Sequence, residues 1–99
     1  MKILEDKLGQ VKALCENHFV EKLYLFGSGV RNELNEKSDV DLLVRFGRIE
    51  LSNYFENYLD FKSKLKSLFG REVDLVEEQT LKNPILINSI NRDKALIYG

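Results

Sequence analysis

Residues 39–46 read Asp-Val-Asp-Leu-Leu-Val-Arg-Phe, and this stretch decides how the rest of the chain is interpreted. Its alternation of side-chain types is typical of a β-strand, because successive side chains of a strand point to opposite faces of a sheet. One face would be apolar, and the other would begin with two carboxylates. The two sets are Val40, Leu42 and Val44 on one face, and Asp39, Asp41 and Leu43 on the other.

Further helix and strand patterns lie on both sides of this strand. Apolar residues recur at helical spacing in two segments, and short runs of strand-forming residues lie between and after them. Gly70 is placed to end the longer helix in a left-handed conformation, and Pro84 suits the first turn of a last, short helix. The predicted helices cover residues 3–19 and 51–69 and a segment opened by residues 80–84; the other predicted strands are 22–26, 72–76 and 95–98.

The length and composition indicate one globular domain over residues 1–99, with 43% hydrophobic and 31% charged residues. Fifteen Lys and Arg against sixteen Asp and Glu give a net charge of -1. This balance argues against a protein that holds duplex nucleic acid by counterion release. The single cysteine, Cys15, cannot form an internal disulfide, and no apolar run is long enough to span a membrane. We therefore expect a cytoplasmic location.

The acids at the start of the 39–46 strand are candidate metal ligands. Side chains two residues apart on a strand lie about 7 Å apart on the same face, so Asp39 and Asp41 can converge. Two neighbouring carboxylates repel each other, and a cation between them removes that cost. Oxygen ligands favour Mg²⁺ or Mn²⁺, and one His and one Cys are too few for a zinc site.

Gly27-Ser28, directly after the 22–26 strand, is a candidate phosphate-binding turn. Free backbone N–H groups at a glycine turn that leads into a helix attract phosphate, and Ser28 adds a hydroxyl donor. Asp74 in the 72–76 strand completes a set suited to phosphoryl or nucleotidyl transfer with two metal ions. Asp74 would contact the second ion or act directly as the general base.

Each of these features also has a plain structural interpretation. Gly27-Ser28 can be an ordinary turn, Asp39 can cap a turn with Ser38, and Asp74 can be a solvated acid on an edge strand. The order in which these features follow one another along the chain is more specific evidence for phosphoryl or nucleotidyl transfer than any one feature alone.

Together the motifs resemble those of the minimal nucleotidyltransferases of the DNA polymerase beta-like superfamily. The resemblance rests on Leu25-Phe-Gly-Ser28, Asp39-Val-Asp-Leu-Leu-Val44 and Arg71-Glu-Val-Asp-Leu-Val76, and it extends to the closing strand. It implies an α+β nucleotidyltransferase fold, a small mixed β-sheet with helices packed mainly on one face.

The resemblance also implies roles for individual residues. Gly27 and Ser28 would bind the nucleoside triphosphate, ATP, and the three acids Asp39, Asp41 and Asp74 would bind Mg²⁺. Arg31 matches the second arginine of the family's Gly-Ser-Arg-x-Arg-Gly motif and would also contact the nucleotide phosphates, whereas Gly29 stands where the first arginine is usual.

Standalone family members of this length imply a protein partner. They are commonly antitoxins that transfer AMP from ATP to a tyrosine of a helical HEPN ribonuclease toxin. Two alternatives stay open: an antitoxin that acts by contact alone, and a nucleotidyltransferase that modifies a small-molecule or RNA hydroxyl.

The 51–69 helix is rich in aromatic residues, which indicate packing against the sheet rather than base stacking. Phe61 lies off the main apolar stripe in this interpretation and would be available to a partner. Cys15 is expected to be a small buried residue, and His18 is expected to interact with the C-terminal end of the first helix.

Overall fold

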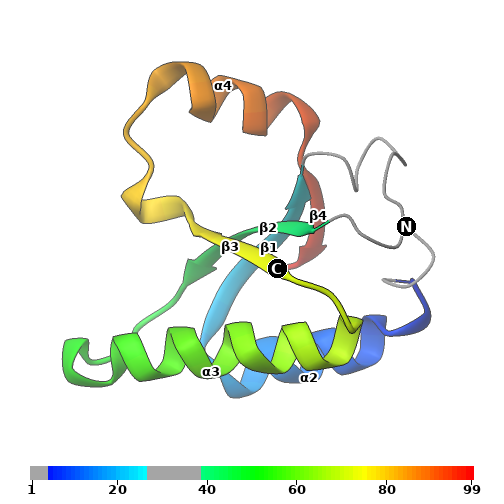
Figure 1. The fold of residues 1–99 in the computed structure, drawn as a ribbon. Helices are drawn as coiled ribbons and strands as arrows, with labels where there is room; N and C mark the ends of the chain where they lie inside the picture. The colour runs from blue at the N-terminus through cyan, green and yellow to red at the C-terminus, as the bar shows by residue number, and fades with distance from the viewer. Residues whose placement is uncertain (1–4, 27–38) are drawn as a thin grey trace.

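The computed structural model describes residues 5–26 and 39–99. Its central feature is a four-stranded mixed sheet with the strand order β3-β2-β1-β4 (Figure 1). β1 is antiparallel to both β2 and β4, and β2 is parallel to β3. The strands are β1 Val20–Phe26, β2 Val40–Phe46, β3 Val73–Glu77 and β4 Ala95–Tyr98.

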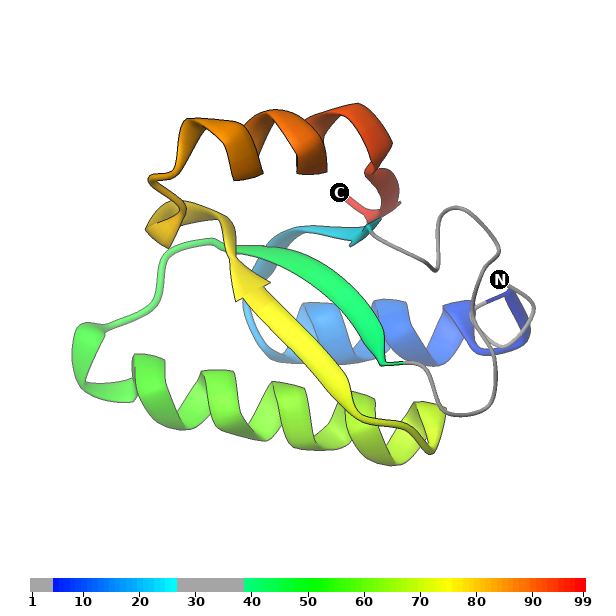
Figure 2. The same cartoon turned by 45° about the horizontal axis from the view of Figure 1, so that its top comes forward.

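In the part of the chain that the structure describes, helices lie on both faces of this sheet (Figures 1 and 2). α2 (Leu8–Asn17) and α3 (Leu51–Phe69) lie side by side on one face, whereas α4 (Pro84–Asp93) crosses the other face. The predicted α+β class, with a mixed sheet and helices mainly on one face, is confirmed. α3 has the predicted bounds and ends at Gly70, whose φ of 64° is readily adopted by glycine.

The main core lies between the sheet and the α2–α3 layer. The apolar face predicted for residues 39–46 is confirmed, because Val40, Leu42 and Val44 are fully buried there. Leu43 is also buried, but on the other face, where it lines a small cavity with Ile87 and Ile90 of α4. Both faces of β2 are therefore covered. On the face that carries Leu43, α4 covers the strand only beyond its acidic end, which holds Asp41.

The ends of several elements differ from the sequence prediction. The first helix was predicted over residues 3–19; Glu5 and Asp6 are helical, a turn at Lys7 follows, and α2 runs from Leu8 to Asn17, two residues short of the predicted end. Phe19 has a positive φ of 60°, which a helix cannot continue through, and its carbonyl accepts a hydrogen bond from the N–H of Gly47 at 2.8 Å. β1 therefore starts at Val20, two residues earlier than predicted.

The last helix also starts later than the predicted segment. Residues 78–80 form a separate 3-10 turn, η2, and the chain then extends to Asn83. The side chain of Asn83 accepts a hydrogen bond from the N–H of Ile85 at 3.0 Å, and Pro84 occupies the first turn. α4 begins here because the cap and the proline act at this position.

A buried histidine connects α2 to α3. His18 contacts the carbonyl of Leu14 through Nδ1 at 2.7 Å and the Asp60 carboxylate through Nε2 at 2.6 Å. The side chain of Asn57 donates to the His18 carbonyl at 2.8 Å. The predicted contact with the C-terminal end of the first helix is confirmed, whereas the bond to Asp60 depends on tertiary packing that the local sequence does not reveal.

Replacing Asp60 by asparagine should make the protein less stable at neutral pH and weaken the pH dependence of its stability in acid. His18 and Lys64 lower the pKa of Asp60 in the folded protein. The stabilisation is therefore complete above the ordinary pKa of an aspartate and is lost as the pH falls through the lowered folded value. Thermal unfolding measured from pH 7 to pH 2 tests this, with Glu56→Gln as the control on the same helix. Equal acid sensitivity of wild type and Asp60→Asn would contradict it.

Within residues 5–26 and 39–99, no helix combines the length and apolar character needed to cross a bilayer. Cys15 is buried, as predicted, and burial, followed by the charge of Glu16, raises the pKa of its thiol to about 12.

Candidate active site

The parallel ladder between β2 and β3 places Asp41 directly beside Asp74. Because Val40 and Leu42 point into the core, the intervening Asp41 side chain points to the opposite face of the sheet. On its other side, Asp41 is paired with Phe26, the last residue of β1. Two of the three predicted acids are therefore neighbours at one end of the sheet.

Asp39 is exposed and lies immediately before the first residue of β2. The N–H of Val40 donates to the carbonyl of Glu72 at 3.0 Å, which fixes the beginning of the β2–β3 pair next to Asp39. Asp74 is exposed on β3, an edge strand. The acids thus lie at an open end of the sheet, where a ligand could reach them.

The charges of these acids interact. The pKa of Asp41 is raised, first by burial of its half-buried carboxyl group and then by the negative charges of Asp74 and Asp39. Like charges in a partly desolvated site disfavour ionisation, and a cation would reverse that effect.

The donor chemistry fits Mg²⁺, which prefers carboxylate oxygen ligands and retains several waters. Asp41 and Asp74, paired across β2 and β3, are the carboxylates that could share the ion, with Asp39 before the start of β2. Among the described residues, no cluster of three or more His, Cys, Asp and Glu side chains is close enough to hold one ion. The structure thus pairs Asp41 with Asp74 and leaves Asp39 at the entrance to the strand.

The predicted phosphate-binding residues Gly27, Ser28 and Arg31 lie outside the described residues. β1 ends at Phe26, directly before Gly27 in the sequence and next to Asp41 in the sheet. The described part of β1 therefore ends beside Asp41, and the predicted phosphate-binding residues follow it directly in the sequence.

The side chains of Lys94 and Tyr24 lie on the face of the sheet that carries Asp41 and Asp74, here called the acidic face. No pattern in the sequence singled them out. The Nζ atom of Lys94 lies 4.2 Å from the ring centroid of Tyr24. Tyr24 is paired with Leu43 on β2 and with Leu96 on β4, so its ring is on the same face as Asp41. The two residues are far apart in the chain, and no local pattern indicates their contact.

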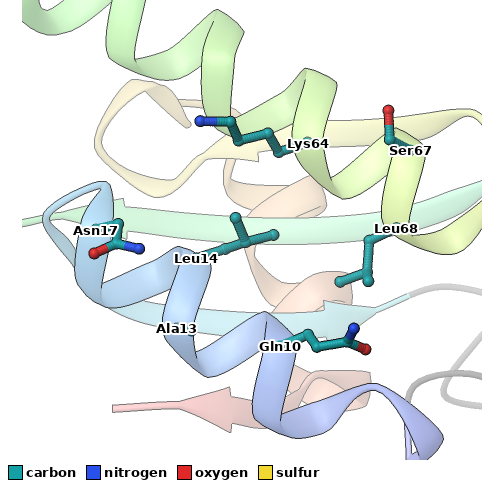
Figure 3. A pocket seen from close by; sticks show the side chains of 7 residues that line it. All are labelled: Gln10, Ala13, Leu14, Asn17, Lys64, Ser67 and Leu68. Atoms are coloured by element: carbon teal, nitrogen blue, oxygen red, sulfur yellow. The ribbon is translucent and has the colours of Figure 1, made fainter.

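An open, mostly apolar groove lies on the other side of the sheet, between α2 and α3 (Figure 3). Its volume is about 450 Å³, and Leu14 of α2 and Leu68 of α3 approach each other across it. None of the three acids lines it. The groove is therefore separate from the acidic face.

Comparison with known proteins gives consistent matches. Residues 9–99 match the family described as Polymerase beta, Nucleotidyltransferase. A relative from Methanocaldococcus jannaschii, named as a protein adenylyltransferase, is 41% identical over 87 residues, covering 88% of this chain and 84% of the relative. The protein adenylyltransferase MntA of Thermococcus cleftensis is 39% identical over 74 residues, covering 75% of this chain and 72% of the relative.

Comparison with solved structures finds the same fold. A minimal nucleotidyltransferase superposes with a TM-score of 0.80 at 32% identity, covering 95% of this chain and 92% of that one. Two toxin–antitoxin structures share the fold at lower identity. One, with AMP-PNP, has a TM-score of 0.73 at 20% identity and coverages of 93% and 73%. The other, a tri-AMPylated Shewanella oneidensis HEPN toxin with its MNT antitoxin, has a TM-score of 0.67 at 18% identity and coverages of 96% and 71%.

The paired acids, the mixed sheet and these matches agree with one another and with the resemblance seen in the sequence. The chain belongs to the polymerase beta nucleotidyltransferase family, among relatives named protein adenylyltransferases.

Proposed function

We propose that this protein is a Mg²⁺-dependent adenylyltransferase that transfers AMP from ATP to a tyrosine of a HEPN ribonuclease toxin, and so acts as its antitoxin. The observation that carries the proposal is the pairing of Asp41 with Asp74 across β2 and β3, on the face of the sheet away from the main core. The names of the relatives and the toxin–antitoxin neighbours support the protein acceptor. Cytoplasmic location is part of the same proposal.

Two sets of residues would bind the metal and the nucleotide. In this proposal Asp39, Asp41 and Asp74 would hold the metal, and Gly27, Ser28 and Arg31 would bind the phosphates of ATP. When bound, Mg²⁺ neutralises part of the negative charge of the triphosphate and lowers the pKa of the acceptor hydroxyl.

The transfer itself exchanges one phosphorus–oxygen bond for another. The acceptor oxygen forms a bond to the α-phosphorus of ATP, and the bond from that phosphorus to the bridging oxygen of the β-phosphate breaks. Pyrophosphate leaves with the electron pair of the broken bond. The carboxylate of Asp74 accepts the proton of the acceptor hydroxyl, the role of a general base.

A second candidate function is neutralisation of the toxin by contact, without catalysis. It is favoured by Gly29, which stands where the family motif usually has its first arginine and so removes one potential phosphate contact. The experiment below separates the two functions.

The test uses ATP labelled at either the α- or the γ-phosphate, the protein, Mg²⁺ and the HEPN toxin that the proposal assigns as its partner. We expect the α-label, and not the γ-label, to appear on a toxin tyrosine, and EDTA to abolish the transfer. Mass spectrometry of the toxin identifies the modified residue. Protection from the toxin with no label on it would support the contact function instead, and transfer of the γ-label would indicate phosphorylation.

A further inference from the structure

Lys94 occupies a defined place beside the acidic end of the sheet. It is the C-cap residue directly after α4 and precedes β4, and its N–H donates to the carbonyl of Ile90 at 2.8 Å. Its side chain is half-buried, with the ammonium group over the ring of Tyr24. The backbone of Lys94 is therefore held in place between the end of α4 and the start of β4.

The sheet register places this cation level with the acids. Ala95 is paired with Leu25, so Lys94 precedes β4 at the level of Phe26, which is itself paired with Asp41. With neighbouring strands about 4.8 Å apart, the backbone of Lys94 lies roughly 10 Å from that of Asp41, across β1. The contact with Tyr24 shows that the lysine side chain is on the face that carries Asp41.

The charge of Lys94 has no anionic partner among the described residues. Lys64 and Lys66 of α3, in contrast, form ion pairs of 2.9 and 2.7 Å with Asp60 and Glu72. A ring beneath the ammonium group attracts it but leaves its positive charge in place. A half-buried cation on this face can therefore pair with a ligand that carries negative charge.

We propose that Lys94 binds the β- and γ-phosphates of the nucleotide and stabilises the negative charge of pyrophosphate as it leaves. The inference rests on the proposed function, since that function supplies the triphosphate. The acids and Lys94 lie on opposite sides of β1 and carry opposite charges, which suits a ligand whose reacting phosphate lies near the acids and whose remaining phosphates extend toward Lys94. A cation at the leaving group stabilises charge that develops in the transition state.

The experiment compares Lys94→Gln with wild type by calorimetric titration of ATP, pyrophosphate and AMP, each with Mg²⁺. Loss of one charge-assisted contact should weaken ATP and pyrophosphate about tenfold and AMP less than twofold. Lys94→Arg should retain most of the affinity. Lys12→Gln on α2, across the sheet, is the matched control because it makes the same change in net charge. Thermal unfolding of each variant verifies that it is folded.

The outcomes separate this inference from the proposed function. Equal pyrophosphate affinity of Lys94→Gln and Lys12→Gln would overturn the role of Lys94 while leaving adenylyl transfer by the wild type intact. Weakening of AMP to the same extent as pyrophosphate would also overturn it, because the contact would then be to the part of the nucleotide that is transferred. Failure of the wild type to bind ATP or transfer the α-label would overturn both proposals.

Discussion

Replacing Asp41 by asparagine is expected to reduce AMP transfer by about 10²–10³-fold, the range seen when one group that stabilises transition-state charge is removed. Of the three acids, Asp41 is the one with a paired strand neighbour on each side, Asp74 on β3 and Phe26 on β1. Asparagine has nearly the same shape but no negative charge to hold a cation. The measurement is the initial rate of α-label transfer at saturating Mg²⁺.

The same substitution should slightly stabilise the protein when no metal is present. Burial and two neighbouring acids raise the pKa of Asp41 in the folded state. The folded protein therefore binds more protons than the unfolded chain between the ordinary and the raised pKa, and the free energy of unfolding falls as the pH rises through that interval. Asparagine removes this penalty. Because the side chain is partly solvated, we expect a gain of a few tenths of a kcal/mol at pH 7, about 1–3 °C in Tm.

Glu56→Gln is the control for both measurements, because it removes an exposed carboxylate from α3 on the far side of the sheet. It should leave the transfer rate and the Tm nearly unchanged. Full activity of Asp41→Asn would refute the assignment of the site. A marked fall in its Tm in metal-free buffer would show instead that the Asp41 charge is compensated within the folded protein.

The acidic face was predictable because its signal is local. The alternation of apolar and acidic residues in 39–46 fixes which side chains share a face, and the same alternation places Asp74 in a second strand. What the local pattern could not provide was the register between these strands. The structure supplies it by pairing Asp41 with Asp74.

Contacts between distant parts of the chain were missed for the opposite reason. The bond of His18 to Asp60 and the position of Lys94 over Tyr24 each join residues about forty or more positions apart. Neither partner carries a sequence signal that identifies the other. Such contacts depend on how helices and strands are rotated against each other, which packing of the whole core decides.

The rotation of α3 also explains an error about its aromatic residues. Phe61 was expected to lie off the packed face and to be available to a partner, but it is fully buried. Its ring centroid lies 5.3 Å from that of His18 and 6.0 Å from that of Phe46. Phe55, on the same helix, is instead 69% exposed. The helix is thus turned so that Phe61, and not Phe55, faces the sheet.

These two residues give a matched pair of truncations on one helix. Phe61→Ala should lower the free energy of unfolding by about 3–5 kcal/mol, because it removes a buried ring and leaves a cavity. That is a large part of the roughly 5–15 kcal/mol expected for a whole domain. Phe55→Ala should change it by no more than about 0.5 kcal/mol, since the ring is mostly solvated. Urea unfolding followed by circular dichroism measures both.

The expected difference also bears on the active site. α3 packs against β3, where the Tyr58 hydroxyl donates to the carbonyl of Leu75, next to Asp74, at 2.6 Å. A cavity at Phe61 weakens the layer that supports this strand. The AMP transfer activity of Phe61→Ala should therefore fall in proportion to the fraction of protein that is folded, whereas Phe55→Ala should keep its activity. Phe61→Leu refills part of the cavity and should recover stability and activity together. Similar destabilisation by Phe55→Ala and Phe61→Ala would mean that α3 is rotated differently against the sheet.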